Sequence, residues 1–190
     1  MVTITITTAR LLKARLLRKL HMDILCNIET ERLLLRPLSD EEWIVVVDHV
    51  FEASESLIQF GIDVDTFRKE MVEEPYREDV VYFAVVLGVR DDLIGYVGFT
   101  PRSNNLEFYV FYEYRREGYA YEAICAFVKA ITEGTITGKP QTKIVTQVIS
   151  DNTACIELMK KLRFSECGCG FDITNGWGFL AFEYVVGVKT

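Results

Sequence analysis

One stretch of the chain indicates both a strand-to-helix turn and a ligand: residues 106–123 read LEFYVFYEYRREGYAYEA. Its first six residues are apolar or aromatic except for one glutamate, which is typical of a strand. From Gly118 the apolar residues recur at helical spacing, and Gly134 is expected to end this helix. Gly118 and Ala120 are small enough for the backbone to approach a ligand closely. Unpaired N–H groups and the dipole at a helix start favour a phosphate or pyrophosphate.

The charges around this loop suit an anion. Arg115 and Arg116 stand in a chain with 21 basic and 28 acidic residues, a formal net charge of −7. An ordinary loop is the alternative, and the segment is neither a GxGxxG loop nor a P-loop, because the glycine spacing and the lysine are missing. The acidic balance argues against a nucleic acid as partner and favours a cationic or amine partner.

Residues 1–21 differ from the rest, since they hold basic residues and no acidic one. Without a continuous apolar core they do not read as a secretory signal. A basic amphipathic helix, binding a membrane or acting as a transit peptide, remains an alternative. We favour a vector-derived extension, because Met22 makes a sensible native start. The expected division is a leader, 1–21, and one domain, 22–190.

The five cysteines are an odd number without a secretory leader, which predicts reduced thiols in a cytoplasmic protein. Cys167 and Cys169 have no second Cys or His pair at zinc spacing, so no metal is expected. The longest apolar run, residues 80–89, is too short to cross a bilayer, so no membrane partner is expected.

The remaining elements follow from periodicity and turn signals. A capping box at Ser39–Glu42 opens a helix, and Asp151 or Asn152 caps a later one. Asn175-Gly176 marks a hairpin turn. Strands are expected at 33–36, 80–87, 93–99, 106–111, 143–149, 165–171 and 178–185, and helices from 40, at 65–73, at 120–131 and at 155–162. This order predicts a mixed sheet with helices on its faces.

Three segments, in the right order, resemble the GNAT superfamily of N-acetyltransferases. Residues 114–123 are similar to the "yRGrGYAtEA" run of the branch that includes ribosomal-protein alanine acetyltransferases, and within it RREGYA is similar to the Q/R-x-x-G-x-G/A acyl-CoA loop. Residues 30–37, TERLLLRP, are similar to that branch's opening strand "TeRLxLRp". Residues 152–164 are similar to its "N-x-x-S…kLGF" segment. Together they cover most of residues 28–165.

The resemblance implies a fold of the mixed α/β class. A GNAT domain has a central, twisted, mostly antiparallel sheet of about six to seven strands, flanked by about four helices. Two neighbouring parallel strands splay apart, and acyl-CoA lies in the cleft between them.

The resemblance also implies a reaction and its cofactor contacts. Acetyl moves from acetyl-CoA to a primary amine, either a small amine or a protein N-terminus, by direct attack in a ternary complex. The backbone of 110–112 would pair with pantetheine, the amides of 116–120 would hold the pyrophosphate, and Asn152 would contact the cofactor unless it is a plain helix cap. The cofactor-binding residues expected are Val110, Phe111, Tyr112, Arg115, Arg116, Glu117, Gly118, Tyr119, Ala120, Asn152 and Cys155.

The sequence departs from the family pattern at several of these positions. Arg116 and Arg163 replace glycines, Tyr112 replaces a common proline, and Cys155 replaces a serine. These changes affect the expected detailed contacts rather than the family.

The motifs leave the identity of the catalytic residues open. Met159 stands where many GNAT enzymes have an acidic tyrosine. We expect Glu107 as general base, because strand alternation puts it on the same face as Tyr109, with a solvated glutamate as the alternative. Tyr112 and Tyr119 are candidate acids, with packing or cleft lining as their alternative role.

The chemistry of Cys155 and the class of protein each allow a second interpretation. A thiol at a helix N-terminus can have a lowered pKa, so an acyl-cysteine intermediate is conceivable. A GNAT-fold module that binds acyl-CoA without turnover, or a loop for another phosphate ligand such as a nucleotide, also fits the motifs.

The acceptor and the partner chain are less defined. Acidic residues between 47 and 76 suit an amine, or they form a solvated face. The apolar strand 178–185 would extend the sheet to a partner, which predicts a homodimer.

Overall fold

The computed structural model describes residues 26–52, 80–88, 90–173 and 176–187. Within these ranges the strands are β1 (Ile28–Glu29), β2 (Leu33–Pro37), β3 (Val81–Leu87), β4 (Asp92–Thr100), β5 (Asn105–Val110), β6 (Lys143–Ile149), β7 (Ser165–Asp172) and β8 (Trp177–Val185). The helices are α2 (Asp40–Glu52), the short 3₁₀ helix η1 (Tyr112–Tyr114), α5 (Tyr119–Glu133) and α6 (Thr153–Lys161). The predicted helix 65–73 and Asn175 of the predicted turn lie outside the described residues.

All eight strands form one sheet in the order β1-β2-β3-β4-β5-β6-β8-β7. The expected number of strands was smaller because β1, two residues long, has no strand pattern of its own. It forms by pairing Ile28 and Glu29 with β2. The mixed sheet itself is confirmed.

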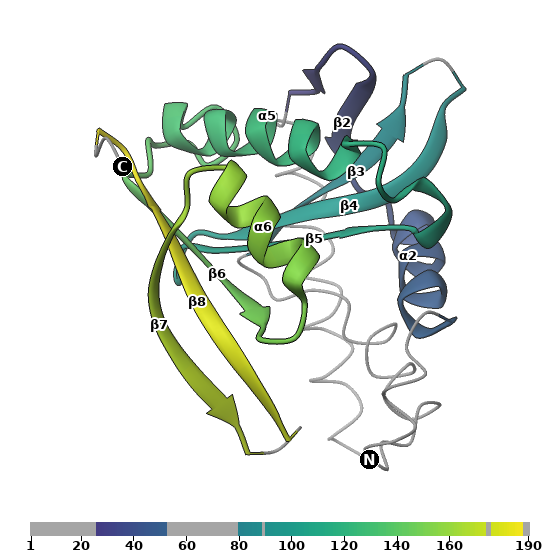
Figure 1. Cartoon of the computed structure of the whole chain (residues 1–190). Coiled ribbons are helices and arrows are strands. Elements are labelled where there is room, and N and C mark those ends of the chain that lie inside the picture. The colour runs from purple at the N-terminus through teal and green to yellow at the C-terminus, as the bar shows by residue number, and fades with distance from the viewer. Residues whose placement is uncertain (1–25, 53–79, 89, 174–175, 188–190) are drawn as a thin grey trace, which may run out of the picture.

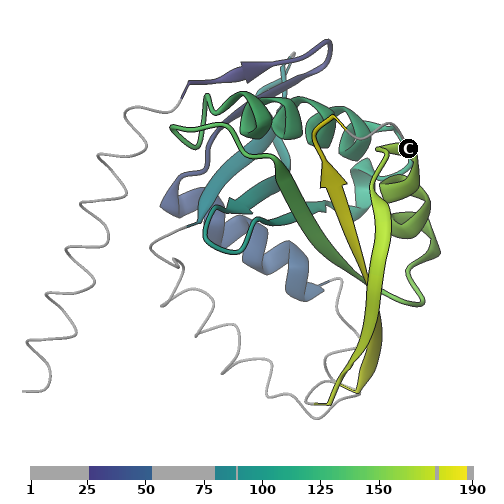
Figure 2. The same cartoon turned by 90° about the vertical axis from the view of Figure 1, so that its left-hand side faces the viewer.

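Helices cover both faces of the sheet. α5 and α6 lie on one face, and α2 lies on the other (Figures 1 and 2). Phe83, Phe127 and Phe182 are fully buried in the core under α5 and α6. Trp43 of α2 packs in a second core against the opposite face, with Phe111.

The predicted helix ends are confirmed. In the capping box, Glu42 N–H donates to Ser39 Oγ over 3.2 Å and Ser39 N–H donates to Glu42 Oε2 over 3.0 Å. Gly134 ends α5 in the left-handed conformation, with φ of 79°. A residue with a side chain is disfavoured at position 134, because of this φ and because its Cβ would clash with the backbone of Lys139 and Pro140.

The strands β5 and β6 are parallel neighbours that separate almost at once. They pair only at Asn105 and Val145, where Val145 N–H donates to Asn104 O over 2.8 Å. Beyond this point β5 follows β4, whereas β6 follows β8 along its whole length. The expected splay between two parallel strands is therefore present, and it opens toward the end of β5.

The predicted route to a homodimer is wrong. β8, the strand expected to reach a partner chain, pairs with β6 on one side and β7 on the other. It has no free edge for another chain. Among the described strands the sheet edge at this end is β7.

Candidate functional site

The end of β5 determines which backbone groups face the splay. Phe111 N–H donates to Ile94 O of β4 over 2.9 Å. Because backbone groups alternate in direction along a strand, those of Phe108 and Val110 point away from β4, toward the side on which β6 diverges. The N–H and C=O of Val110 therefore face the opening.

The backbone groups of Phe111 and the C=O of Val110, two of the expected pantetheine contacts, already have partners within the protein. Both backbone groups of Phe111 bond within the protein, since its C=O accepts from Tyr114 N–H over 3.0 Å. The buried ring of Phe111 stacks on His49, with centroids 3.9 Å apart. Val110 C=O accepts from Arg115 Nε over 2.9 Å, so the arginine occupies an acceptor at the splay.

The loop after η1 presents a series of backbone donors. Among the described residues, the N–H groups from Arg116 to Tyr121 have no protein acceptor, and the first turn of α5 has no side-chain cap. Arg116 and Gly118 both have positive φ, 70° and 82°. Arg116 thus adopts the conformation of the glycine it replaces. This arrangement supports the predicted anion site, where the exposed donors meet the positive end of the helix dipole.

An arginine from a distant part of the sequence also contacts this loop. Arg32, at the bend between β1 and β2, donates from Nη1 to Glu117 O over 2.9 Å. Its Nε lies 2.7 Å from Glu122 Oε2, and its guanidinium lies 4.6 Å from the centroid of the Tyr119 ring. Thr30 Oγ1 also donates to Glu122 Oε1 over 2.6 Å.

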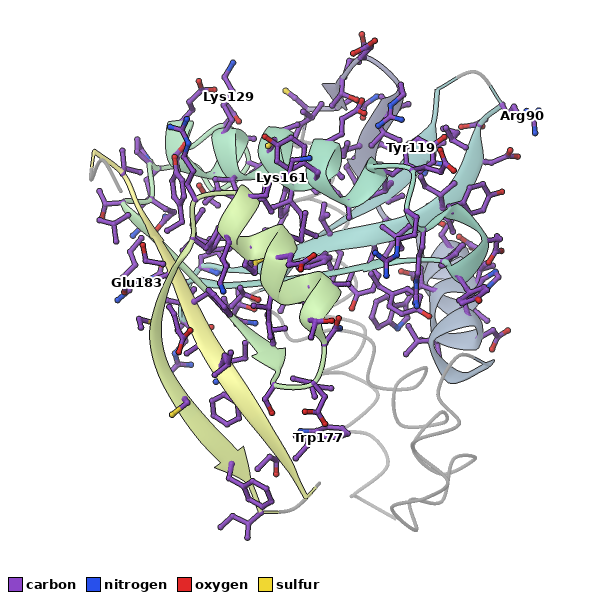
Figure 3. The ribbon with its side chains drawn as sticks, viewed as in Figure 1. Arg90, Tyr119, Lys129, Lys161, Trp177 and Glu183 are labelled. Atoms are coloured by element: carbon purple, nitrogen blue, oxygen red, sulfur yellow. The ribbon has the colours of Figure 1, made fainter. Side chains whose placement is uncertain are left out.

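Two hollows flank α5. One, of about 320 Å³, is lined by Tyr121 and by basic residues at the end of α6, where Lys161 Nζ lies 4.4 Å from the Tyr121 centroid (Figure 3). Arg163 also lines it, with a φ of 64° in place of the family's glycine. The other, of about 330 Å³, lies between the β3–β4 turn, at Arg90, and Tyr119 (Figure 3). Neither hollow is lined by β5 or β6.

The start of α6 confirms the helix-cap interpretation of Asn152. Its Oδ1 accepts from Cys155 N–H over 3.1 Å, so the side chain caps the helix. Asn152 is exposed, and the cap does not use its Nδ2. Burial raises the pKa of Cys155 to about 11. The lowering of the pKa that a helix N-terminus can cause is therefore outweighed by desolvation of the thiolate.

Glu107 lies on the expected face of β5. A Cβ built on Gly98 would meet Glu107 Cγ and the Tyr82 ring. Burial, and then the charge of Glu107, raise the pKa of Tyr96, which stands opposite Tyr109. Tyr109 Oη donates to His49 O over 3.2 Å. Glu107 is thus the carboxylate of a tyrosine-rich surface beside the splay.

The remaining acid candidates have different surroundings. Tyr112 is 75% exposed at the end of β5, and Tyr119 is half-buried under the Arg32 guanidinium. Met159 is fully buried in the core, so that position holds a packing residue.

Sequence reasoning missed Arg32, Glu122 and Tyr96. The first two did leave a signal, because they stand in two of the three family-like segments, TERLLLRP and YAYEA. Tyr96 left none, since only the register of β4 on β5 places it opposite Tyr109.

The splayed strands, the donor-rich loop and the helix that follows are the features of a domain that binds an acyl-CoA. A family model described as "Acetyltransferase (GNAT) domain" matches residues 32–165, more than half of the chain. The chain therefore belongs to the GNAT acetyltransferase family and is an acetyl-CoA-dependent N-acetyltransferase.

Solved structures share this fold at low sequence identity. A GNAT-family acetyltransferase from Bacillus anthracis has 20% identity and a TM-score of 0.63, covering 84% of this chain and 98% of that chain. A ribosomal-protein-S5-alanine acetyltransferase from Vibrio fischeri has 13% identity and a TM-score of 0.62, covering 85% and 97%. A dodecameric spermidine N-acetyltransferase from Vibrio cholerae has 16% identity and a TM-score of 0.61, covering 82% and 95%.

A ribosomal-protein alanine acetyltransferase is thus among the structures that share this fold. A comparison with curated proteins gives no significant match. No helix in the described part of the chain is long and apolar enough to span a bilayer.

Proposed function

We propose that this enzyme acetylates a primary amine, either a small amine or a protein N-terminus, by direct attack on bound acetyl-CoA. The observation that carries the proposal is the loop after β5, because the N–H groups of 116–121 have no protein acceptor among the described residues. Glu107 stands on β5, the strand that leads into this loop. Donors for the cofactor and a carboxylate for the amine thus come from one continuous segment of the chain.

The cofactor would enter with its pyrophosphate on the loop and its pantetheine along β5. Arg116 and Gly118 direct the chain so that successive N–H groups are free to bind phosphate oxygens. Val110 offers its N–H toward the splay, whereas its C=O is held by Arg115. Arg115 would therefore have to release Val110 O before pantetheine could pair there as an added strand.

The chemistry requires a neutral amine. Its nitrogen attacks the thioester carbonyl carbon while Glu107 accepts a proton from it, directly or through water. The tetrahedral adduct then expels the thiolate of CoA as the C–S bond breaks. Of the two candidate acids, Tyr112 is the better donor for this thiolate, because Tyr119 is held under Arg32.

The half-buried Cys155 thiol does not favour an acyl-enzyme. A thiol with a pKa of about 11 is protonated at neutral pH, and the thiolate is the nucleophilic form. Direct transfer within a ternary complex needs no such nucleophile. The region 47–76, expected to select the acceptor, lies mostly outside the described residues.

Glu107→Gln tests the base. Loss of a general base lowers rates by about 10²–10⁴-fold, so we expect kcat to fall in that range in an assay of thiol release over a panel of amines. Affinity for acetyl-CoA should stay unchanged, because the backbone holds the cofactor.

The control is Glu113→Gln, which removes an exposed carboxylate from η1, the turn that follows β5. Equal activity of Glu107→Gln and the wild type would exclude Glu107 as the base. Binding of acetyl-CoA without thiol release, for every amine in the panel, would overturn the proposed transfer.

A further inference from the structure

Arg32 lies far from the loop in sequence but contacts both the loop and the first turn of α5. Its guanidinium bonds Glu117 O, lies against Glu122 Oε2 at 2.7 Å, and stacks 4.6 Å from the centroid of Tyr119. Arg32 N–H also donates to Glu122 Oε1 over 2.9 Å. We propose that Arg32 is a positioning residue for the cofactor: it orients the loop's amides for the pyrophosphate of acetyl-CoA. This inference rests on the proposed function.

The first step concerns the peptide between Glu117 and Gly118. In a planar trans peptide the C=O and the following N–H point in opposite directions. Since Glu117 O points at Arg32 Nη1, Gly118 N–H points away from Arg32. This is one of the N–H groups without a protein acceptor in the described chain. Arg32 thus determines the direction of a donor at the centre of the loop.

The second step concerns charge. Glu122 is a carboxylate in the first turn of α5, next to the expected pyrophosphate. Burial alone raises the pKa of Glu122, but hydrogen bonds from Thr30 and Arg32 outweigh it, so its pKa lies below the ordinary value. The carboxylate is therefore charged at neutral pH. Paired with Arg32 it is neutralised; unpaired, it would repel the phosphate.

The third step concerns helix geometry. Gly118 is the N-cap of α5 and provides no side chain for capping. In place of a cap, the Glu122 carboxylate accepts hydrogen bonds from Thr30 and Arg32 at the β1–β2 bend, and these bonds hold the start of α5 against the sheet. Arg32 completes this set of bonds and leaves the helix N-terminus free for a ligand.

The experiment compares Arg32→Gln with the wild type, using acetyl-CoA and S-acetylpantetheine, which lacks the pyrophosphate. Loss of one charge-assisted hydrogen bond should raise the KM and Kd for acetyl-CoA about tenfold. We expect kcat at saturating acetyl-CoA, and kcat/KM for S-acetylpantetheine, to change less than about twofold.

The matched control is Arg36→Gln. Arg36 forms a two-point ion pair with Glu42, at 2.7 and 2.9 Å, away from the loop. The exposed fractions of the two pairs are similar, 28% and 18% here against 41% and 17% for Arg32 and Glu122. Arg36→Gln should leave the KM for acetyl-CoA unchanged. Arg32→Lys keeps the positive charge but not the planar set of guanidinium donors, so its affinity for acetyl-CoA should remain lower than that of the wild type.

The outcomes are distinct. Unchanged acetyl-CoA affinity in Arg32→Gln, an equal loss with S-acetylpantetheine, an equal loss in Arg36→Gln, or full rescue by Arg32→Lys would each overturn the positioning role. A wild-type protein that neither binds nor consumes acetyl-CoA would instead overturn the proposed function itself.

Discussion

At the scale of single residues, the site depends on side chains whose surroundings change their chemistry. Arg116 and Arg163 adopt left-handed backbone conformations where the family has glycine, with φ of 70° and 64°. Such a conformation costs an L-residue about 1 kcal/mol. Both arginines add positive charge near the loop and the end of α6, which suits a ligand with several phosphates.

Cys155 gives a residue-scale prediction. Because burial raises its pKa to about 11, only the minor thiolate fraction reacts at pH 8. We expect iodoacetamide to modify the exposed Cys167 and Cys169 before Cys155, as followed by peptide mass spectrometry. The rate at Cys155 should rise about tenfold per pH unit until pH approaches this pKa. First modification at Cys155 at pH 8 would contradict the protected environment.

At the scale of elements, the turn from β5 into α5 carries most of the site. Among the described residues it combines a strand that pairs with β6 only at Asn105, a 3₁₀ turn and a helix without a side-chain cap. Each of these three elements leaves backbone groups available to a ligand. They follow one another along the chain from the splay to the N-terminus of α5.

Gly118→Ala tests this turn. Alanine at a φ of 82° should destabilise the fold by about 1 kcal/mol and raise the Kd for acetyl-CoA, because the loop amides shift as the strain is relieved. Gly138→Ala is the matched control, since Gly138 has a φ of 72° and open space around it. We expect similar losses in thermal stability for both variants, measured by calorimetry, and weaker cofactor binding only for Gly118→Ala. Equal affinities in the two variants would argue against the loop as the pyrophosphate site.

At the scale of the whole molecule, one sheet places segments distant in sequence around the opening. Arg32 lies at the bend just before β2 and contacts the loop, Glu107 lies on β5, and Asn152 follows the end of β6. The core under α5 and α6 spans β2 to β8, so binding at the splay is expected to stabilise the entire domain.

Thermal unfolding tests this coupling. Acetyl-CoA at 100 times its Kd should add about 2.7 kcal/mol to the free energy of unfolding and raise the midpoint temperature. ATP and NAD, which lack the pantetheine thioester arm, should shift the midpoint much less. An equal shift with ATP would indicate a general nucleotide site rather than an acyl-CoA site.

Much of the fold was predictable because its signals are local. The capping box of α2, Gly134 after α5 and the alternation in β6 each depend on neighbours within a few residues. The loop motif likewise predicted the cofactor and the segment proposed to bind it. These features follow from the chain's own covalent geometry and hydrogen-bonding needs.

Only the tertiary structure decided the rest. Pairing order put β8 inside the sheet, and strand register put Tyr96 opposite Tyr109. The helix position of Cys155 allowed a lowered pKa, whereas burial raises it. The pairing of Arg32 with Glu122 joins residues 90 positions apart. Desolvation and such contacts depend on which distant segments meet, and local periodicity carries no information about that.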